Sequence, residues 1–183
     1  MEFEQVLTTV LAEFDRHHIR YAAIGGYAVT ALGVQRATHD VDFLVHRDDL
    51  DTLHAVLTPL GYQRVAQTEN VSHYTHPDLR WGSLDFIHAF RAIACEMLEQ
   101  AMPRSILQGT HTIRVVQPED LIGLKVQSMA NNPRRRAKEQ YDIEELAKRY
   151  GHRLDWNRVQ RFYELFDLGA DAKALRARFD HVE

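Results

Sequence analysis

Hydrophobic positions in the first part of the chain repeat first with the period of a helix and then with that of a strand. In residues 2–17 apolar side chains recur every three or four positions, which predicts an amphipathic helix. The segment HHIRYAAIGG, residues 17–26, changes to a short apolar run closed by two glycines, which predicts a strand and a tight turn. Residues 27–34 suit a short helix, and VDFLVH, residues 41–46, favours a strand because it is β-branched and aromatic.

The pattern of the rest of the chain predicts alternating helices and strands at first and only helices afterwards. An acidic first turn, leucines at helical spacing and a final glycine predict a helix over residues 47–61. Further strands are predicted at 62–66, 72–77, 82–89, 105–108 and 111–116, with a helix at 91–101; helices are then predicted at 118–130, 134–151, 156–166 and 171–179.

This order of elements indicates the α/β (or α+β) class with a C-terminal helical part. The chain has 183 residues, of which 45% are hydrophobic and 26% charged, enough for one well-formed core. We expect a core over residues 1–117 and a helical subdomain over residues 118–183 that packs on the core as one structural unit.

Composition narrows the classes of function. The formal net charge of -4 argues against a surface that is positive all over and binds nucleic acid non-specifically. No apolar run approaches the roughly 18 residues of a membrane span, and acids stand where a signal peptide would be basic. A single cysteine, Cys95, excludes an internal disulfide. We therefore expect a soluble, cytoplasmic protein that does not bind membranes.

Two aspartates one residue apart are the first candidate for chemistry. On a strand, Asp40 and Asp42 would project side by side, while Val41 and Phe43 would face the core. Two close carboxylates repel each other, and either a retained proton or a bound cation relieves the repulsion. Ligand sets made only of oxygen favour Mg²⁺ or Mn²⁺ over zinc.

A third acid, Asp85, lies in the apolar segment SLDFIH, where a lone charge would be unusual in a buried strand. If that strand neighbours the first, three carboxylates converge, as two-metal phosphoryl or nucleotidyl transfer requires: one metal activates the attacking oxygen, and the other holds the triphosphate. An edge-strand acid that faces water is the alternative for Asp85.

The glycine turn before the short helix fits the same chemistry. A bare backbone at Gly25 and Gly26 can approach phosphate oxygens closely. Arg36 and Thr38 would add a guanidinium fork and a hydroxyl to the same site. A tight strand-to-helix turn would demand these glycines even without a phosphate.

Together these residues resemble the nucleotidyltransferase superfamily of the DNA polymerase β type, which shows a Gly-Gly turn, a short helix, an Asp-x-Asp strand and a later third acid. The pattern R-x-T-x-D-x-D, residues 36–42, resembles the minimal bacterial branch that includes the AbiEii-like toxins. The resemblance covers residues 20–150 and implies a nucleotidyltransferase-like mixed sheet flanked by helices.

The resemblance also implies roles for individual residues. A helical lysine and a later aspartate complete the site in that branch, and the candidates here are Lys125 and Asp142. The family often has Lys-Asp before its last motif, whereas this chain has Lys138 and Glu139. The alternatives are a Lys125 side chain that reaches solvent and an exposed ion pair of Asp142 with Lys138. The implied catalytic residues are Asp40, Asp42, Asp85, Lys125 and Asp142; the metal ligands are Asp40, Asp42 and Asp85; the nucleotide-binding residues are Gly25, Gly26, Arg36, Thr38 and Lys125.

The implied activity is transfer of NMP from an NTP to a hydroxyl group, with Mg²⁺ or Mn²⁺ as cofactor and pyrophosphate as product. The acceptor stays open between RNA, such as tRNA, and a small molecule, such as an aminoglycoside. The toxin branch implies an antitoxin partner protein.

Two other functions remain as alternatives. One is a nucleotide- or protein-binding module without turnover, such as a toxin-antitoxin component. The other is a phosphohydrolase, because His39 and Asp40 imitate a metal-binding His-Asp pair. The basic run Arg134, Arg135 and Arg136 predicts either a solvated surface or a contact with RNA or nucleotide.

Overall fold

A computed structural model describes residues 1–181 of the chain and divides it into two compact units. The first unit comprises residues 1–31 and 36–116, and the second comprises residues 32–35 and the chain from Gln117 onward. The loop 32–35 belongs to the second unit, where the Tyr150 hydroxyl donates a hydrogen bond to the Leu32 carbonyl at 2.8 Å.

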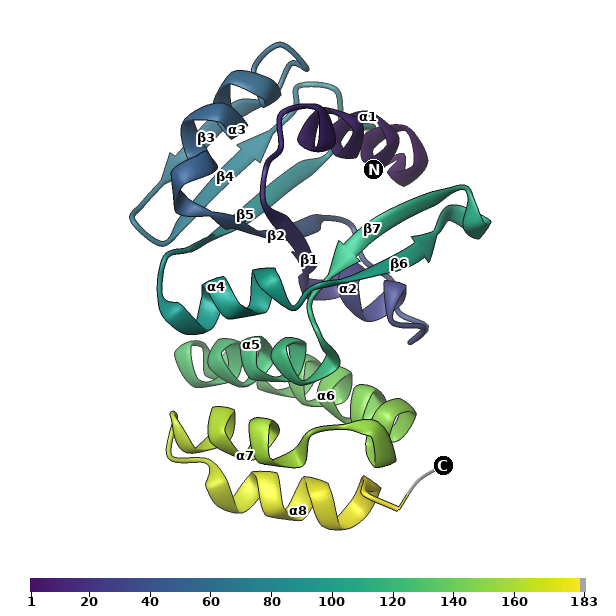
Figure 1. Cartoon of the computed structure of the whole chain (residues 1–183), viewed down its shortest axis with the longest axis vertical. Coiled ribbons are helices and arrows are strands. Elements are labelled where there is room, and N and C mark those ends of the chain that lie inside the picture. Colours follow the sequence, from purple (N-terminus) through teal and green to yellow (C-terminus); the bar gives the residue numbers. More distant parts are fainter. Residues whose placement is uncertain (182–183) are drawn as a thin grey trace. The chain divides into compact units, whose positions relative to one another are not determined.

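The first unit is built on a mixed sheet of seven strands within residues 1–181, in the order β3-β4-β5-β2-β1-β7-β6 (Figure 1). β2 runs parallel to β5 and β1 parallel to β7, and the other neighbours are antiparallel. This confirms the predicted α/β class. The strands are β1 (Tyr21–Ile24), β2 (Val41–His46), β3 (Gln63–Gln67), β4 (Val71–Thr75), β5 (Ser83–Ala89), β6 (Met102–Ile106) and β7 (His111–Val115).

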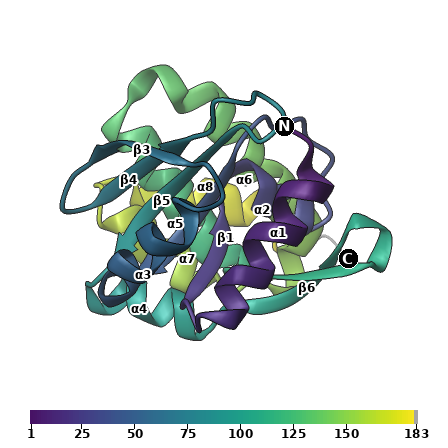
Figure 2. The same cartoon turned by 90° about the horizontal axis from the view of Figure 1, so that it is seen from above.

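Helices cover both faces of this sheet. α1 (Phe3–Arg16) and α3 (Leu50–Leu57) lie on one face, and α2 (Gly25–Ala31) and α4 (Ala92–Glu99) lie on the other (Figures 1 and 2). A short 3-10 turn, Arg47–Asp49, precedes α3.

The core of the first unit lies between α1 and the sheet. Phe14 is fully buried, and its ring centroid lies 5.1 Å from that of Tyr21, 5.5 Å from Phe43 and 6.3 Å from Phe86. Because side chains alternate along a strand, burial of Phe43 under α1 turns its neighbour Asp42 to the opposite face of β2.

Three of the differences between the structure and the predicted elements concern candidate site residues. Asp40 lies in a bend just before β2 rather than on the strand. α2 begins at Gly25 instead of residue 27, so the glycine turn is part of the helix. Arg134 and Arg135 lie in a 3-10 turn, and the helix predicted from residue 134 begins at Arg136.

The second unit consists of four α-helices within the described residues: α5 (Pro118–Asn131), α6 (Arg136–Tyr150), α7 (Trp156–Glu164) and α8 (Gly169–Phe179). α5 packs against α6 and α7, and α8 packs against α6 and α7 (Figure 1). Its interior holds charged side chains as well as apolar ones, among them Lys125, Glu139 and Asp142.

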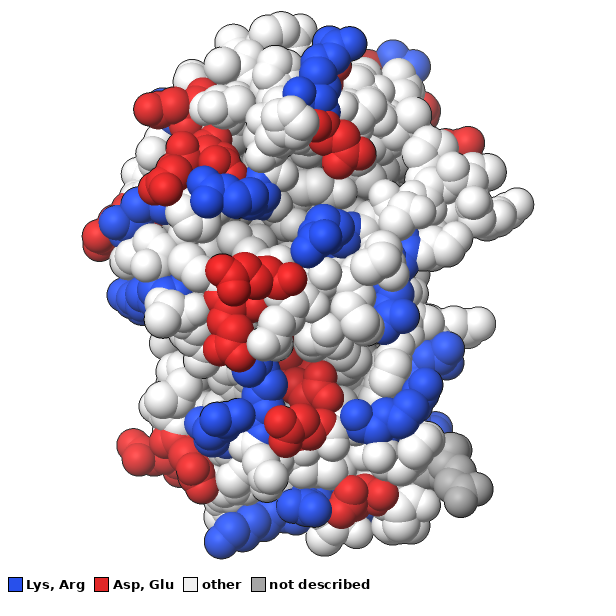
Figure 3. Space-filling view, viewed as in Figure 1, with Lys and Arg blue, Asp and Glu red and all other residues white. Residues whose placement is uncertain are grey.

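The surface carries both signs of charge. On the face in Figure 3, basic and acidic side chains are interspersed rather than gathered by sign. None of the helices in residues 1–181 combines the length and the apolar character that crossing a membrane requires.

The aromatic cluster around Phe14 predicts a stability effect. Phe14→Ala should lower the free energy of unfolding by about 3–5 kcal/mol, because it removes a buried ring and leaves a cavity. Urea unfolding would measure this change. The control Leu79→Ala should change little, because the Leu79 side chain is 87% exposed. Equal effects of the two substitutions would contradict the central place of Phe14 in the core.

Candidate active site

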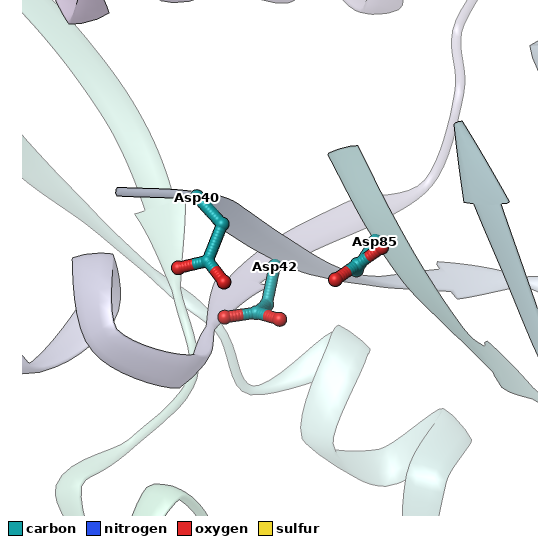
Figure 4. Close-up of side chains that lie close together, drawn as sticks. All are labelled: Asp40, Asp42 and Asp85. Carbon is teal, nitrogen blue, oxygen red and sulfur yellow. The ribbon is translucent and has the colours of Figure 1, made fainter. Parts of the chain in front are cut away.

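Three carboxylates converge on the sheet face opposite α1. Asp40 comes from the bend before β2, Asp42 from β2 itself and Asp85 from β5 (Figure 4). Each offers one oxygen, and these oxygens all lie within 4.8 Å of one another. Parallel pairing of β2 and β5 sets Asp42 directly opposite Asp85.

This donor set fits a divalent cation. Two unit charges about 4 Å apart repel by roughly 1 kcal/mol in water and by about 4 kcal/mol at an effective dielectric constant of 20. A cation bound among three oxygen donors removes this repulsion, and Mg²⁺ and Mn²⁺ prefer such ligands. His39 is exposed and is not a member of the group, so the group lacks the His-Asp pair of the phosphohydrolase alternative.

Gly25 is required by the position of Asp42. Its φ of +64° lies in the left-handed region, and a Cβ built there would overlap the Asp42 carboxylate. Glycine therefore lets the backbone of α2 lie directly against the Asp42 carboxylate.

Gly26 lies directly against the two polar residues that precede the acids. A Cβ at Gly26 would overlap the Arg36 guanidinium and lie 2.8 Å from the Thr38 hydroxyl oxygen. Thr38 in turn donates a hydrogen bond from Oγ1 to Asp40 Oδ1 at 3.0 Å. The structure thus gathers these predicted residues with the acids: Gly25, Gly26, Arg36, Thr38, Asp40, Asp42 and Asp85.

Lys125 and Asp142 meet in the second unit. Lys125 Nζ donates to Asp142 Oδ2 at 2.6 Å and to Glu139 Oε2 at 2.9 Å. Lys125 and Asp142 are 4% and 0% exposed. A Lys125 that reaches solvent and an exposed pair of Asp142 with Lys138 were therefore wrong alternatives, because both side chains are buried against each other.

Comparison with known proteins gives the family. A family described as uncharacterised nucleotidyltransferase matches residues 2–169, which is most of the chain. The chain belongs to this nucleotidyltransferase family. Among curated proteins, none shows significant sequence similarity to it.

Solved structures agree with this assignment at the level of the fold. The solution structure of the antibiotic-resistance factor ANT(2'')-Ia has a TM-score of 0.67 and 18% identity, over 99% of this chain and 100% of that one. Its crystal structure with adenylyl-2''-tobramycin has a TM-score of 0.65 and 19% identity, over 96% of this chain and 95% of that one. The lincomycin-bound lincosamide antibiotic adenylyltransferase LnuA has a TM-score of 0.54 and 16% identity, over 78% of this chain and 95% of that one. At these identities the likeness shows the nucleotidyltransferase fold alone.

Two residues that contact predicted site residues were missed in the sequence. Glu139 is 2% exposed and binds Lys125, and Arg135 Nε donates to its Oε1 at 2.9 Å. Its spacing of three residues from Asp142 places both on one helix face, which was a usable signal. His73 lies 2.7 Å from Asp85, a contact that depends on strand pairing and left no local signal.

The basic run at the start of α6 is partly engaged by acids. Arg135 pairs with Glu139 at 2.8 Å, and Arg136 pairs with Asp171 at 3.5 Å. A contact of these arginines with RNA or nucleotide stays a prediction.

The contact between Gly25 and Asp42 predicts unequal costs for two glycine substitutions. Gly25→Ala should cost more than the roughly 1–2 kcal/mol of a left-handed backbone, because its methyl group also displaces the Asp42 carboxylate. The control is Gly109→Ala, where φ is +92° but the nearest atom is Ser105 Oγ at 3.8 Å. Urea unfolding of both variants measures the difference, and equal costs would refute the steric argument.

The Glu139 cluster predicts a dependence of stability on pH. Burial raises the pKa of Glu139, but the charges and hydrogen bonds of Lys125 and Arg135 outweigh burial and hold this pKa below its usual 4.5. A depressed folded pKa stabilises the fold above the unfolded pKa, and this stability is lost as pH falls through the folded pKa.

Glu139→Gln should therefore lower the free energy of unfolding at neutral pH by about 1.5–3 kcal/mol, the scale of a charged hydrogen bond. The difference from wild type should shrink as pH falls below about 4.5. Urea unfolding across this range would measure it. Glu145→Gln, on the same helix but outside the cluster, is the control; a difference that stays constant with pH would contradict the prediction.

Proposed function

We propose that this nucleotidyltransferase moves NMP from an NTP to a hydroxyl group, with Mg²⁺ or Mn²⁺ as cofactor. The convergence of Asp40, Asp42 and Asp85 within 4.8 Å carries the proposal. In the reaction the acceptor oxygen forms a bond to the α-phosphorus, the bond from that phosphorus to the β-phosphate bridge breaks, and pyrophosphate leaves.

The three acids would divide the work. Asp40 and Asp42 would hold both divalent ions of a two-metal mechanism, and Asp85 would hold one of them and accept the proton of the acceptor hydroxyl. When bound, a divalent ion supplies Lewis-acid stabilisation of the charge that develops on the phosphates. Thr38 would keep Asp40 in place through the hydrogen bond between their side chains.

The glycine turn and Arg36 would bind the triphosphate. Backbone N–H groups at Gly25 and Gly26 and the Arg36 guanidinium are donors suited to phosphate oxygens. The glycines themselves are needed so that Asp42 and Arg36 can approach the backbone.

Lys125 would offset phosphate charge, as the resemblance to the superfamily implies. Its contacts with Glu139 and Asp142 use two of the three ammonium protons. Asp142 would then hold the lysine in place rather than touch the nucleotide.

For the acceptor we propose a small hydroxyl-bearing molecule. ANT(2'')-Ia, whose crystal structure contains adenylyl-2''-tobramycin, aligns over 95% of its own length. The net charge of -4 and the mixed surface in Figure 3 give little of the field that attracts a nucleic acid backbone. RNA remains the second candidate, supported by the basic run at residues 134–136.

A binding module without turnover, such as a toxin-antitoxin component with an antitoxin partner, is the alternative function. NTP binding that needs no divalent cation, or a partner protein that covers Asp40, would support it. The complete set of three acids favours turnover.

The proposed function is tested by label transfer. Purified protein is incubated with each α-labelled NTP, Mg²⁺ or Mn²⁺, and either a panel of aminoglycosides and other small alcohols or total RNA. Label should move to a small acceptor, and Asp42→Asn should reduce transfer by about 100-fold or more, since it removes a charge from the metal site. The control Asp51→Asn changes an exposed acid on α3 and should leave transfer unchanged.

Each other outcome contradicts part of the proposal. Label on one RNA size class would replace the small acceptor with RNA. Free phosphate without a modified acceptor would indicate a phosphohydrolase. Transfer to no acceptor with any NTP and either metal would refute nucleotidyl transfer by this chain.

A further inference from the structure

His73 lies beside the carboxyl triad in a row that crosses three strands. Pairing of β4 with β5 sets His73 directly opposite Asp85, and pairing of β5 with β2 sets Asp85 directly opposite Asp42. His73 Nδ1 lies 2.7 Å from Asp85 Oδ1. Asp85 therefore has a negative neighbour on one side and a ring nitrogen on the other.

The direction of this hydrogen bond follows from its partners. A carboxylate that binds a cation can only accept a hydrogen bond, and in the tautomer that serves such a carboxylate His73 Nδ1 carries the hydrogen and donates it to Asp85. A distance of 2.7 Å is typical of a bond to a charged acceptor, which is stronger than a neutral one.

Asp85 needs such a partner to stay in the site. Its side chain is 32% exposed, so it has room to turn toward water. Repulsion by Asp40 and Asp42 favours that turn whenever a cation is not bound. The bond from His73 holds one oxygen of Asp85, and Figure 4 shows an oxygen of the same carboxylate directed toward Asp42.

We propose that His73 is a positioning residue that holds the Asp85 carboxylate in its metal-binding orientation. The inference rests on the proposed function in one respect, the use of the triad as a metal site. Donors that bind a metal-ligating side chain from behind orient it before the metal arrives, and their loss typically lowers metal affinity or activity by about 10–100-fold.

A surface pair without a role in the site would behave differently. A cross-strand pair of this kind contributes roughly 0.2–1 kcal/mol to stability whether or not a cation binds. The two interpretations therefore separate when metal affinity and stability are measured on the same variants.

The test measures Mn²⁺ binding to the full chain without nucleotide, with electron paramagnetic resonance as the method of detection. His73→Phe keeps the ring shape but removes the donor, and it should weaken Mn²⁺ binding by about 10-fold or more. His73→Asn places an amide N–H near the position of Nδ1 and should restore most of the affinity. His73→Gln places its amide near Nε2 instead and should bind as weakly as His73→Phe.

A matched control comes from another half-buried histidine on the same sheet. His111 on β7 contacts the hydroxyls of Thr8 and Thr110 and none of the three acids. His111→Asn should bind Mn²⁺ like wild type. Thermal unfolding without metal shows whether each variant is folded, and the pair His73→Asn and His73→Gln keeps the test decisive if His73→Phe does not fold.

Kinetics give a second readout. Because Asp85 is proposed to accept the acceptor's proton, His73→Phe should lower kcat for NMP transfer and change the KM for NTP little. A merely structural role would lower activity only in proportion to the loss of folded protein.

Wild-type Mn²⁺ affinity in His73→Phe, or equal affinities of His73→Asn and His73→Gln, would overturn the inference. Failure of the wild-type chain to bind Mn²⁺ would overturn both the inference and the metal dependence of the proposed function. Mn²⁺ binding without transfer to any acceptor would contradict the proposed function alone, since the affinities of the His73 variants would still decide the inference.

Discussion

The candidate active site depends on holding three negative charges together against their mutual repulsion. Apolar packing on the other face of the sheet supplies the restraint. Phe43 and Phe86 are buried and stacked with ring centroids 5.6 Å apart. Because side chains alternate along each strand, burying these rings forces Asp42 and Asp85 side by side on the opposite face. A slip of β5 by one residue would bury the aspartate and expose the ring, so the core fixes the geometry of the acids.

The sequence predicts local features of this molecule well and pairings across the chain poorly. Periodicity located the strands of Asp42 and Asp85, because β-branched and aromatic runs bounded by turns are a local signal. The sequence placed Asp40 on the strand, whereas it lies in the bend one residue before β2, because a bend and a strand end have similar local sequences. The contact of His73 with Asp85 arises from the register of β4 on β5, which no local pattern encodes. The spacing of Glu139 from Asp142 places both on one helix face, but the family pattern includes only the aspartate.

The buried charges of the second unit illustrate a different balance. Desolvation offsets most of the attraction in a buried ion pair, so Lys125, Glu139 and Asp142 need not add to stability compared with an apolar cluster. Breaking the cluster is nevertheless costly, because a charge is left without its partner. Two contacts of Lys125 on α5 with Glu139 and Asp142 on α6, together with the Ser128 hydroxyl on Glu139 at 3.3 Å, define how these two helices align. These contacts therefore hold the Lys125 side chain in one orientation within the second unit.

The contact between Gly26 and Arg36 couples which residues can occur at these two positions during evolution. Gly26 does not have a left-handed φ, and the atoms nearest to a Cβ built there belong to Arg36 and Thr38. Once a descendant of this gene replaces Arg36 with a short side chain, purifying selection on Gly26 relaxes. Paired loss of this glycine and this arginine in homologues would then mark lineages in which the site has decayed, even where the aspartates have not yet been replaced.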